Sequence, residues 1–198
     1  MKRWCSTEMF NQGKRLFSSI YRRKQQASPN HEIHFLAKEL DQWLVEGIHR
    51  IKSGIYSPRH TKRHYFDDGV VEQLYVCDRV FQHLILKQLK PTFKHITNAN
   101  CLHLHGPNGV KVAADKVDKA LLCEEYQYFI RADIKFYYRS IQHRFLIDDI
   151  KQAFRDEKII HMLTEIIKNP IDTPWGTKNP DFGLPLRGLY RNSLAHCI

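Results

Sequence analysis

Residues 126–141, Tyr-Gln-Tyr-Phe-Ile-Arg-Ala-Asp-Ile-Lys-Phe-Tyr-Tyr-Arg-Ser-Ile, are the stretch around which the rest of the chain is interpreted. Most of this stretch alternates with period two, which predicts a strand with two unlike faces. Asp133 lies on the more polar face, between Arg131 and Lys135. A carboxylate on a rigid strand could hold a hard cation. The plainer interpretation is a solvated carboxylate between two basic residues on an ordinary sheet.

The excess of basic residues indicates which kind of partner the protein binds. Among 198 residues, 31 are Lys or Arg and 21 are Asp or Glu, which gives a formal net charge of +10. Such a balance favours polyanions, and nucleic acid is the leading candidate. An anionic membrane surface is the rival. No apolar run has the length of a membrane span, and residues 1–8 lack the apolar core of a signal peptide. We therefore expect a cytoplasmic protein without membrane segments.

The five cysteines do not indicate a disulfide framework, because they are odd in number, widely spaced and without a C-x-x-C pair. We interpret them as reduced thiols. Cys101, His103 and His105 would share one face of an extended segment. A structural zinc site normally has a fourth ligand, so a small metal site there is a remote alternative to a partly buried strand end.

Hydrophobic periodicity predicts an α+β fold, with helices packed on a small antiparallel sheet. We expect residues 1–30 to be a loosely held basic arm. The pattern then predicts a helix over 33–51 that ends at Ser53-Gly54, followed by a hairpin of strands 61–66 and 70–76. A second helix begins after Asp78 as N-cap and ends at Pro91. Further helices are predicted over 110–121, 139–154 and 158–167, and a loop or short hairpin over 169–180.

The string Arg-Ala-Asp-Ile-Lys-Phe-Tyr-Tyr-Arg-Ser-Ile-Gln-His at 131–143 resembles the first palm motif of the reverse transcriptases of bacterial retroelements and group II introns. The resemblance implies that Asp133 is the first catalytic aspartate. It also implies that Mg²⁺ is held by the Asp133 carboxylate and the Ile134 backbone. Tyr138 matches the aromatic that lies under the sugar of the incoming nucleotide.

Two further stretches resemble motifs of the same family, in the same order along the chain. Residues 75–91 resemble its D-R-V-x-Q helix, which lies close to the template, so the resemblance implies template contacts by Arg79 and Gln82. Residues 183–195 resemble its G-[IL]-P motif, which implies template contacts by Gly183 and Pro185. Arg187 and Arg191 depart from this motif, where glycine and serine are expected.

The predicted hairpin before these motifs resembles the fingers hairpin of the family. The family often carries a basic residue in the strand before the D-R-V-x-Q helix, where it holds the nucleotide triphosphate. Residues 70–74 contain none, and Lys62, Arg63 and Arg79 are the substitutes for that contact. Residues 65–68, Tyr-Phe-Asp-Asp, spell the Y-x-D-D string of reverse transcriptases but precede the Asp133 stretch. We interpret Asp67 and Asp68 as turn residues; a permuted palm is the alternative.

After the basic arm over 1–30, the resemblance implies a fingers-like region over 31–125 and a partial palm over 126–198 that stops before a Y-x-D-D hairpin and thumb. Such a fragment would extend a DNA primer on an RNA template with deoxynucleotides only with a complementing palm and thumb chain. The alternative is a non-catalytic module that binds RNA or a protein partner, with aromatics such as Tyr137, Tyr138 and Tyr190 stacking on bases.

Overall fold

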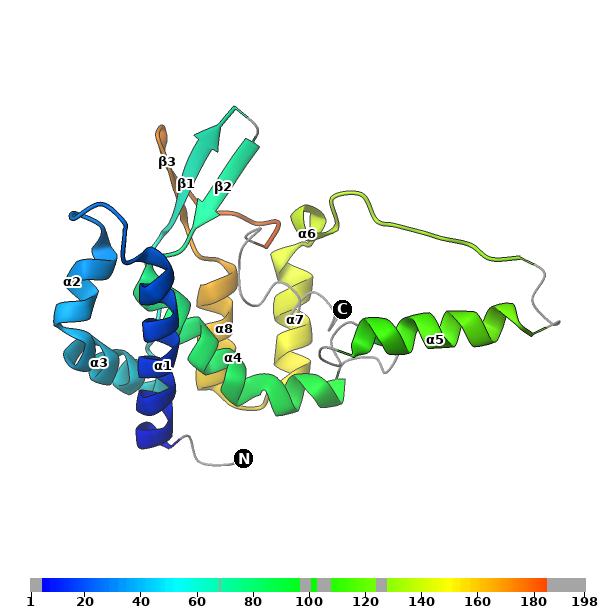
Figure 1. The fold of residues 1–198 in the computed structure, drawn as a ribbon, viewed down its shortest axis with the longest axis horizontal. Helices are drawn as coiled ribbons and strands as arrows, with labels where there is room; N and C mark the ends of the chain where they lie inside the picture. Colours follow the sequence, from blue (N-terminus) through cyan, green and yellow to red (C-terminus); the bar gives the residue numbers. More distant parts are fainter. Residues whose placement is uncertain (1–4, 68, 97–100, 103–107, 124–127, 185–198) are drawn as a thin grey trace.

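The computed structural model describes residues 5–67, 69–96, 101–102, 108–123 and 128–184. Helices pack against a small four-stranded sheet, which confirms the α+β class (Figure 1). The elements are α1 (Ser6–Lys24), α2 (Glu32–Lys38), α3 (Leu40–Ser53), β1 (Thr61–Phe66), β2 (Gly69–Gln73), α4 (Val76–Ile96), α5 (Gly109–Leu121), α6 (Tyr137–Ser140), α7 (His143–Ala153), α8 (Glu157–Ile167), β3 (Ile171–Thr173) and β4 (Gly176–Lys178).

The sheet has the strand order β2-β1-β3-β4. Strands β1 and β2 form the predicted antiparallel hairpin, and β3 and β4 form the second, shorter one. Strands β1 and β3 are parallel, with Thr61 opposite Ile171. The prediction of a purely antiparallel sheet is therefore wrong, because two hairpins far apart in sequence join edge to edge.

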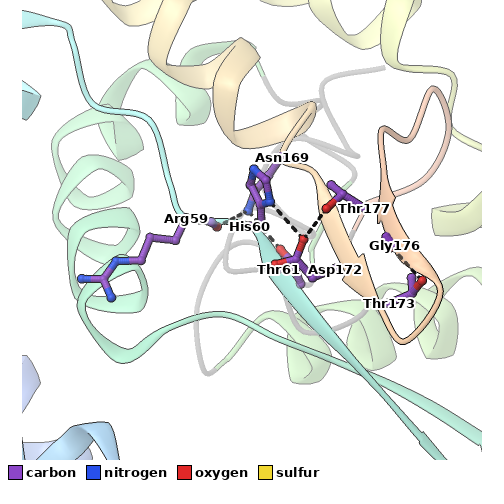
Figure 2. Close-up of polar contacts among 8 residues, drawn as sticks. All are labelled: Arg59, His60, Thr61, Asn169, Asp172, Thr173, Gly176 and Thr177. Atoms are coloured by element: carbon purple, nitrogen blue, oxygen red, sulfur yellow. Dashed lines mark hydrogen bonds and ion pairs between the residues drawn. The ribbon is translucent and has the colours of Figure 1, made fainter.

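A polar cluster holds the parallel pair together (Figure 2). The side-chain amide of Asn169 donates to the carbonyl oxygen of Arg59 and to the hydroxyl of Thr61, both at 3.0 Å. On the more exposed side, His60 Nδ1 lies 3.0 Å from a carboxylate oxygen of Asp172. The sheet thus fixes the position of the segment around β3 relative to the first hairpin.

The core lies between the helices, where Leu44, Leu84, Leu146 and Leu163 are fully buried. The Phe81 ring packs edge-on against neighbouring aromatic rings and covers Gly47 on α3 so closely that a Cβ there would overlap it. No helix among the described residues is long and apolar enough to cross a bilayer.

The N-terminal region is a packed helix, so the prediction of a loosely held arm is wrong. Met9, Gly13 and Phe17 lie one helical turn apart on α1 and are all buried. Gly13 lets α1 approach Leu44 on α3, and Phe17 packs edge-on against Trp43 at 5.6 Å. These three buried positions are enough to hold α1 against the body, because the opposing helices supply the rest of the apolar surface.

Helix α4 differs from its prediction at both ends. It begins at Val76 and continues past Pro91 to Ile96, and Figure 1 shows it bent. A proline inside a helix removes one backbone hydrogen bond and kinks the helix without having to end it. Asp78 is not the N-cap; instead the Glu32 carboxylate accepts a hydrogen bond from the Val76 amide at 3.0 Å.

The predicted helix over 33–51 is divided at Glu39 into α2 and α3. Its predicted end is confirmed, because Gly54 caps α3 in the left-handed conformation with φ of 77°. The helices at the positions of α5, α7 and α8 are confirmed as well, and the segment after α8 forms the short hairpin of β3 and β4.

The strand predicted around Asp133 is not formed. Residues 128–134 are irregular and exposed, and Figure 1 shows an extended connection that leads to α6 and lies apart from the sheet. A strand needs a hydrogen-bonded neighbour, and no strand of the described chain lies beside this segment. The alternating pattern alone therefore did not determine its structure.

Candidate functional site

A cleft of about 310 Å³ lies between the β1–β2 hairpin and the segment after β4. Its walls come from β1, β2 and β3, from α6 and the end of α8, and from the residues that follow β4. It is lined by Arg63, Val70, Glu72, Arg139, Ile167, Asn169, Ile171, Pro180, Phe182, Gly183 and Leu184. Two residues singled out by sequence, Arg63 and Gly183, therefore line one cleft although they are far apart along the chain.

Arg63 is the half-buried cation of this cleft. Its guanidinium pairs with the Glu72 carboxylate on β2 at 2.5 Å. Burial on its own lowers the pKa of Arg63, but the hydrogen bond and the charge of Glu72 outweigh it, so the pKa is raised. Arg63 stays charged and is held in place, with part of its hydrogen-bonding capacity already used by Glu72.

Gly183 is held against α6 and α7 by backbone hydrogen bonds. Its amide donates to the Ile141 carbonyl at 2.8 Å, and His143 Nε2 donates to the Gly183 carbonyl at 2.7 Å. Its φ of 85° and the backbone of Arg139, which lies 3.4 Å from where a Cβ would be, both favour glycine. Pro185 and the rest of the matched motif lie outside the described residues.

Asp133 and Ile134 lie on the exposed segment before α6, and they do not line the cleft. No group of three or more His, Cys, Asp or Glu side chains in the described ranges could hold a metal ion. Magnesium requires near-octahedral oxygen coordination, which one carboxylate and one backbone carbonyl do not fix. The described residues therefore do not fit a bound Mg²⁺ on their own.

The two candidates for the triphosphate contact that belong to β1 lie on opposite faces of that strand. Lys62 and Arg63 are neighbours on the strand, so their side chains point to opposite sides of the sheet. Arg63 lines the cleft, whereas the Lys62 ammonium lies 4.6 Å from the centre of the Tyr75 ring. They are not placed to contact one nucleotide together from the same side.

Tyr138 is half-buried on α6. Its ring packs edge-on against Tyr137 at 5.2 Å, and its carbonyl oxygen accepts a hydrogen bond from the Leu184 amide. Tyr138 therefore helps to anchor the segment that carries Gly183.

In α4, the helix that resembles D-R-V-x-Q, the two residues expected to contact a template differ in their exposure. Gln82 is buried, whereas Arg79 is half-buried. Asp78 is buried and accepts hydrogen bonds from the Tyr56 hydroxyl at 2.9 Å and from the Arg59 amide. Burial raises the pKa of Asp78 despite these hydrogen bonds. This end of α4 is a polar support for the sheet.

Sequence reasoning missed two residues that line the cleft, Asn169 and Arg139, and the unusual backbone of Phe136 just before α6. Asn169 is buried, lines the cleft and joins β1 to β3. Arg139 lines the cleft from α6. Phe136 has φ of 56°, and among the described non-glycine residues it alone has a positive φ. No motif points to Asn169, whereas the basic and aromatic character of residues 135–145 is visible in the sequence.

Of the other sequence candidates, Asp67 lies in the hairpin turn, in agreement with its interpretation, and Asp68 lies outside the described residues. Cys101 is half-buried, while His103 and His105 lie outside the described residues. Comparison with known proteins found no family model that matches the chain and no curated protein sequence that is significantly similar to it.

Proposed function

We propose that this chain is the fingers and partial palm of an RNA-directed DNA polymerase of the bacterial retroelement type. In this proposal it contributes to the extension of a DNA primer on an RNA template and is inactive alone. The basis is the order of three motif resemblances along the chain, together with its net charge of +10.

The observation that carries the proposal is the shared cleft. Arg63 comes from the stretch that resembles the fingers hairpin, and Gly183 from the stretch that resembles a palm motif, and both line it. In this proposal the phosphate of a nucleotide would contact the part of the Arg63 guanidinium that Glu72 does not occupy, and the base would lie on the apolar wall. The fold thus brings together two regions that the proposed function requires to be close.

Catalysis would require metal ligands besides Asp133. In this proposal the exposed Asp133 carboxylate would be one metal ligand, and the family mechanism requires further carboxylates. The remainder of a palm and thumb would supply them and would pack against residues 128–134.

The test is primer extension by the full chain, with and without a palm and thumb fragment from a group II intron reverse transcriptase. A DNA primer on an RNA template, deoxynucleotides and Mg²⁺ would be supplied, and products measured on a denaturing gel. We expect extension only with both chains, and loss of extension with Asp133→Ala. The matched control is Asp148→Ala, an exposed carboxylate on α7 that pairs only with Lys151 among the described ion pairs. Equal extension by Asp133→Ala and wild type would refute the catalytic role.

The second candidate function is a non-catalytic RNA-binding module. The observation that favours it is that Asp133 lies on an exposed, irregular segment rather than on a strand. Under this alternative, RNA binding is present, Asp133→Ala leaves it unchanged, and no complementing fragment restores extension.

A further inference from the structure

Two exposed phenylalanine rings lie close together in sequence, at the start of α6 and in the first turn of α7. Phe136 is 62% exposed and Phe145 is 50% exposed. Each ring has a basic side chain beside it: Arg144 lies 4.4 Å from the centre of the Phe145 ring, and Lys135 lies 5.3 Å from that of Phe136. Arg139 lies 5.7 Å from the Phe136 ring on the other side in sequence.

We infer that the aromatic–basic segment, residues 135–145, binds single-stranded RNA, with bases stacking on Phe136 and Phe145 and phosphates contacting Lys135, Arg139 and Arg144. Proteins that bind single strands combine exposed aromatic rings with a basic surface that follows the backbone. Here a basic side chain lies over each ring at cation–π distance. A base that stacks on the ring therefore uses the face that the cation leaves open or displaces the cation, which then contacts the neighbouring phosphate.

The backbone at Phe136 supports a role for its ring beyond folding. A φ of 56° is unfavourable for a residue with a Cβ, and glycine or asparagine would relieve it. The ring also gains little from burial, because most of it remains exposed. A conformation that costs backbone energy and leaves an apolar ring in water is typical of a functional site.

Charge distinguishes RNA from an apolar protein partner. Between residues 128 and 145 the sequence has four basic residues, Arg131, Lys135, Arg139 and Arg144, and one acidic residue, Asp133. A purely apolar partner surface would have to desolvate these cations without compensation, whereas a nucleic-acid backbone neutralises them. Tyr128 and Phe129, 89% and 84% exposed, offer further rings along the same direction of the chain.

The inference deepens the proposed function, since it names the surface that would hold the RNA strand. The two can fail separately. Complementation and Asp133→Ala test catalysis, whereas the experiment below measures RNA affinity and needs no catalysis.

The experiment is fluorescence anisotropy of a labelled 20-nucleotide poly(U) RNA titrated with the full chain, at several salt concentrations. We expect Phe136→Leu and Phe145→Leu each to weaken binding by roughly tenfold, because leucine keeps an apolar surface but loses the stacking face. Phe136→Tyr should bind like wild type, because tyrosine keeps the ring. Arg144→Gln should lower the salt dependence of binding, because one phosphate contact is lost.

The matched control is Phe35→Leu on α2, where the ring is 58% exposed; it should bind like wild type. Absence of measurable RNA binding by the wild type would overturn the inference. Equal affinities of wild type and either leucine variant would overturn it as well, because binding would then rest on charge or on general apolar contact. A deoxyribonucleotide 20-mer of the same sequence shows whether the surface also accepts DNA, and clear preference for that DNA would overturn the assignment to RNA.

Discussion

The helical body and the connection that leads to α6 contain similar apolar residues in very different surroundings. In the body, Leu84 and Ile85 on α4 and Leu163 on α8 are fully buried, whereas Ile130 on the connection is 94% exposed. Helix α5, which precedes the connection, also exposes valine and leucine side chains. Among the described residues, the body helices thus cover one another's apolar faces, whereas the connection and α5 leave apolar side chains exposed.

This contrast teaches that apolar content alone does not predict burial. Each body helix faces another apolar helix that the same chain supplies, so its side chains are removed from water at a gain of roughly 25 cal/mol per Å². The connection has no opposing surface among the described elements. Substitutions of buried and of exposed groups test this division.

The largest difference should appear between Leu84→Ala and Ile130→Ala. Leu84 is fully buried, so its truncation should lower the free energy of unfolding by about 2–5 kcal/mol. Ile130→Ala should change it by no more than about 0.5 kcal/mol. Urea denaturation followed by circular dichroism measures both. A loss above about 2 kcal/mol for Ile130→Ala would mean that the connection packs against the body in solution.

A smaller effect is expected at the junction of β1 and β3. Asn169→Ala removes two hydrogen bonds and leaves the Arg59 carbonyl and the Thr61 hydroxyl without the amide. We expect a loss of about 1–3 kcal/mol in the free energy of unfolding. Thr177→Ala, which removes an exposed hydrogen bond to Asp172, is the control and should be near neutral. Similar midpoints for both variants would contradict a stabilising junction.

The pH dependence of stability should report on buried Asp78. Because burial raises its pKa, the folded state keeps a proton that the unfolded state has lost between the ordinary and the raised pKa. Stability therefore falls as pH rises through this window. In the Asp78→Asn variant this loss of stability with rising pH should be absent. Thermal melting temperatures of wild type and variant, measured from acidic to neutral pH, test this. An unchanged profile would assign the pH dependence to other groups.

The smallest effect on stability is expected for Phe136→Gly. Relief of the left-handed conformation contributes about 1–2 kcal/mol, and the greater freedom of glycine in the unfolded chain offsets about 0.5–1 kcal/mol of it. The free energy of unfolding should stay the same or rise by up to about 1.5 kcal/mol. A clear destabilisation in denaturant would show that the Phe136 ring packs as part of the body.

Elements with a strong local pattern could be predicted from the sequence. The first hairpin follows from Asp67-Asp68-Gly69 between two strand-like runs, and the end of α3 follows from Gly54. The α1 helix could not be recognised as packed, because its stability depends on apolar surface that α3 and α4 supply. Nor could local signals show that α4 continues past Pro91, since a proline kink and a helix end share the same signal.

The candidate site was predictable only in part. Sequence resemblance pointed to Arg63 and Gly183, and the fold brings both to one cleft. Asn169 carries no motif, and its role depends on the parallel pairing of β1 and β3, which no local pattern encodes. The segment around Asp133 shows the opposite case, a clear period-two pattern without a neighbouring strand to pair with.

The parallel pairing of β1 and β3 also has a consequence for the order of folding. The Asn169 to Thr61 hydrogen bond spans 108 residues, so on the ribosome the first hairpin waits, with one edge open, until the second has been synthesised. Closing so long a loop is slow compared with helix and hairpin formation. The sheet should therefore be among the last parts to assemble, and an open β1 edge during synthesis is where misassembly between nascent chains would begin.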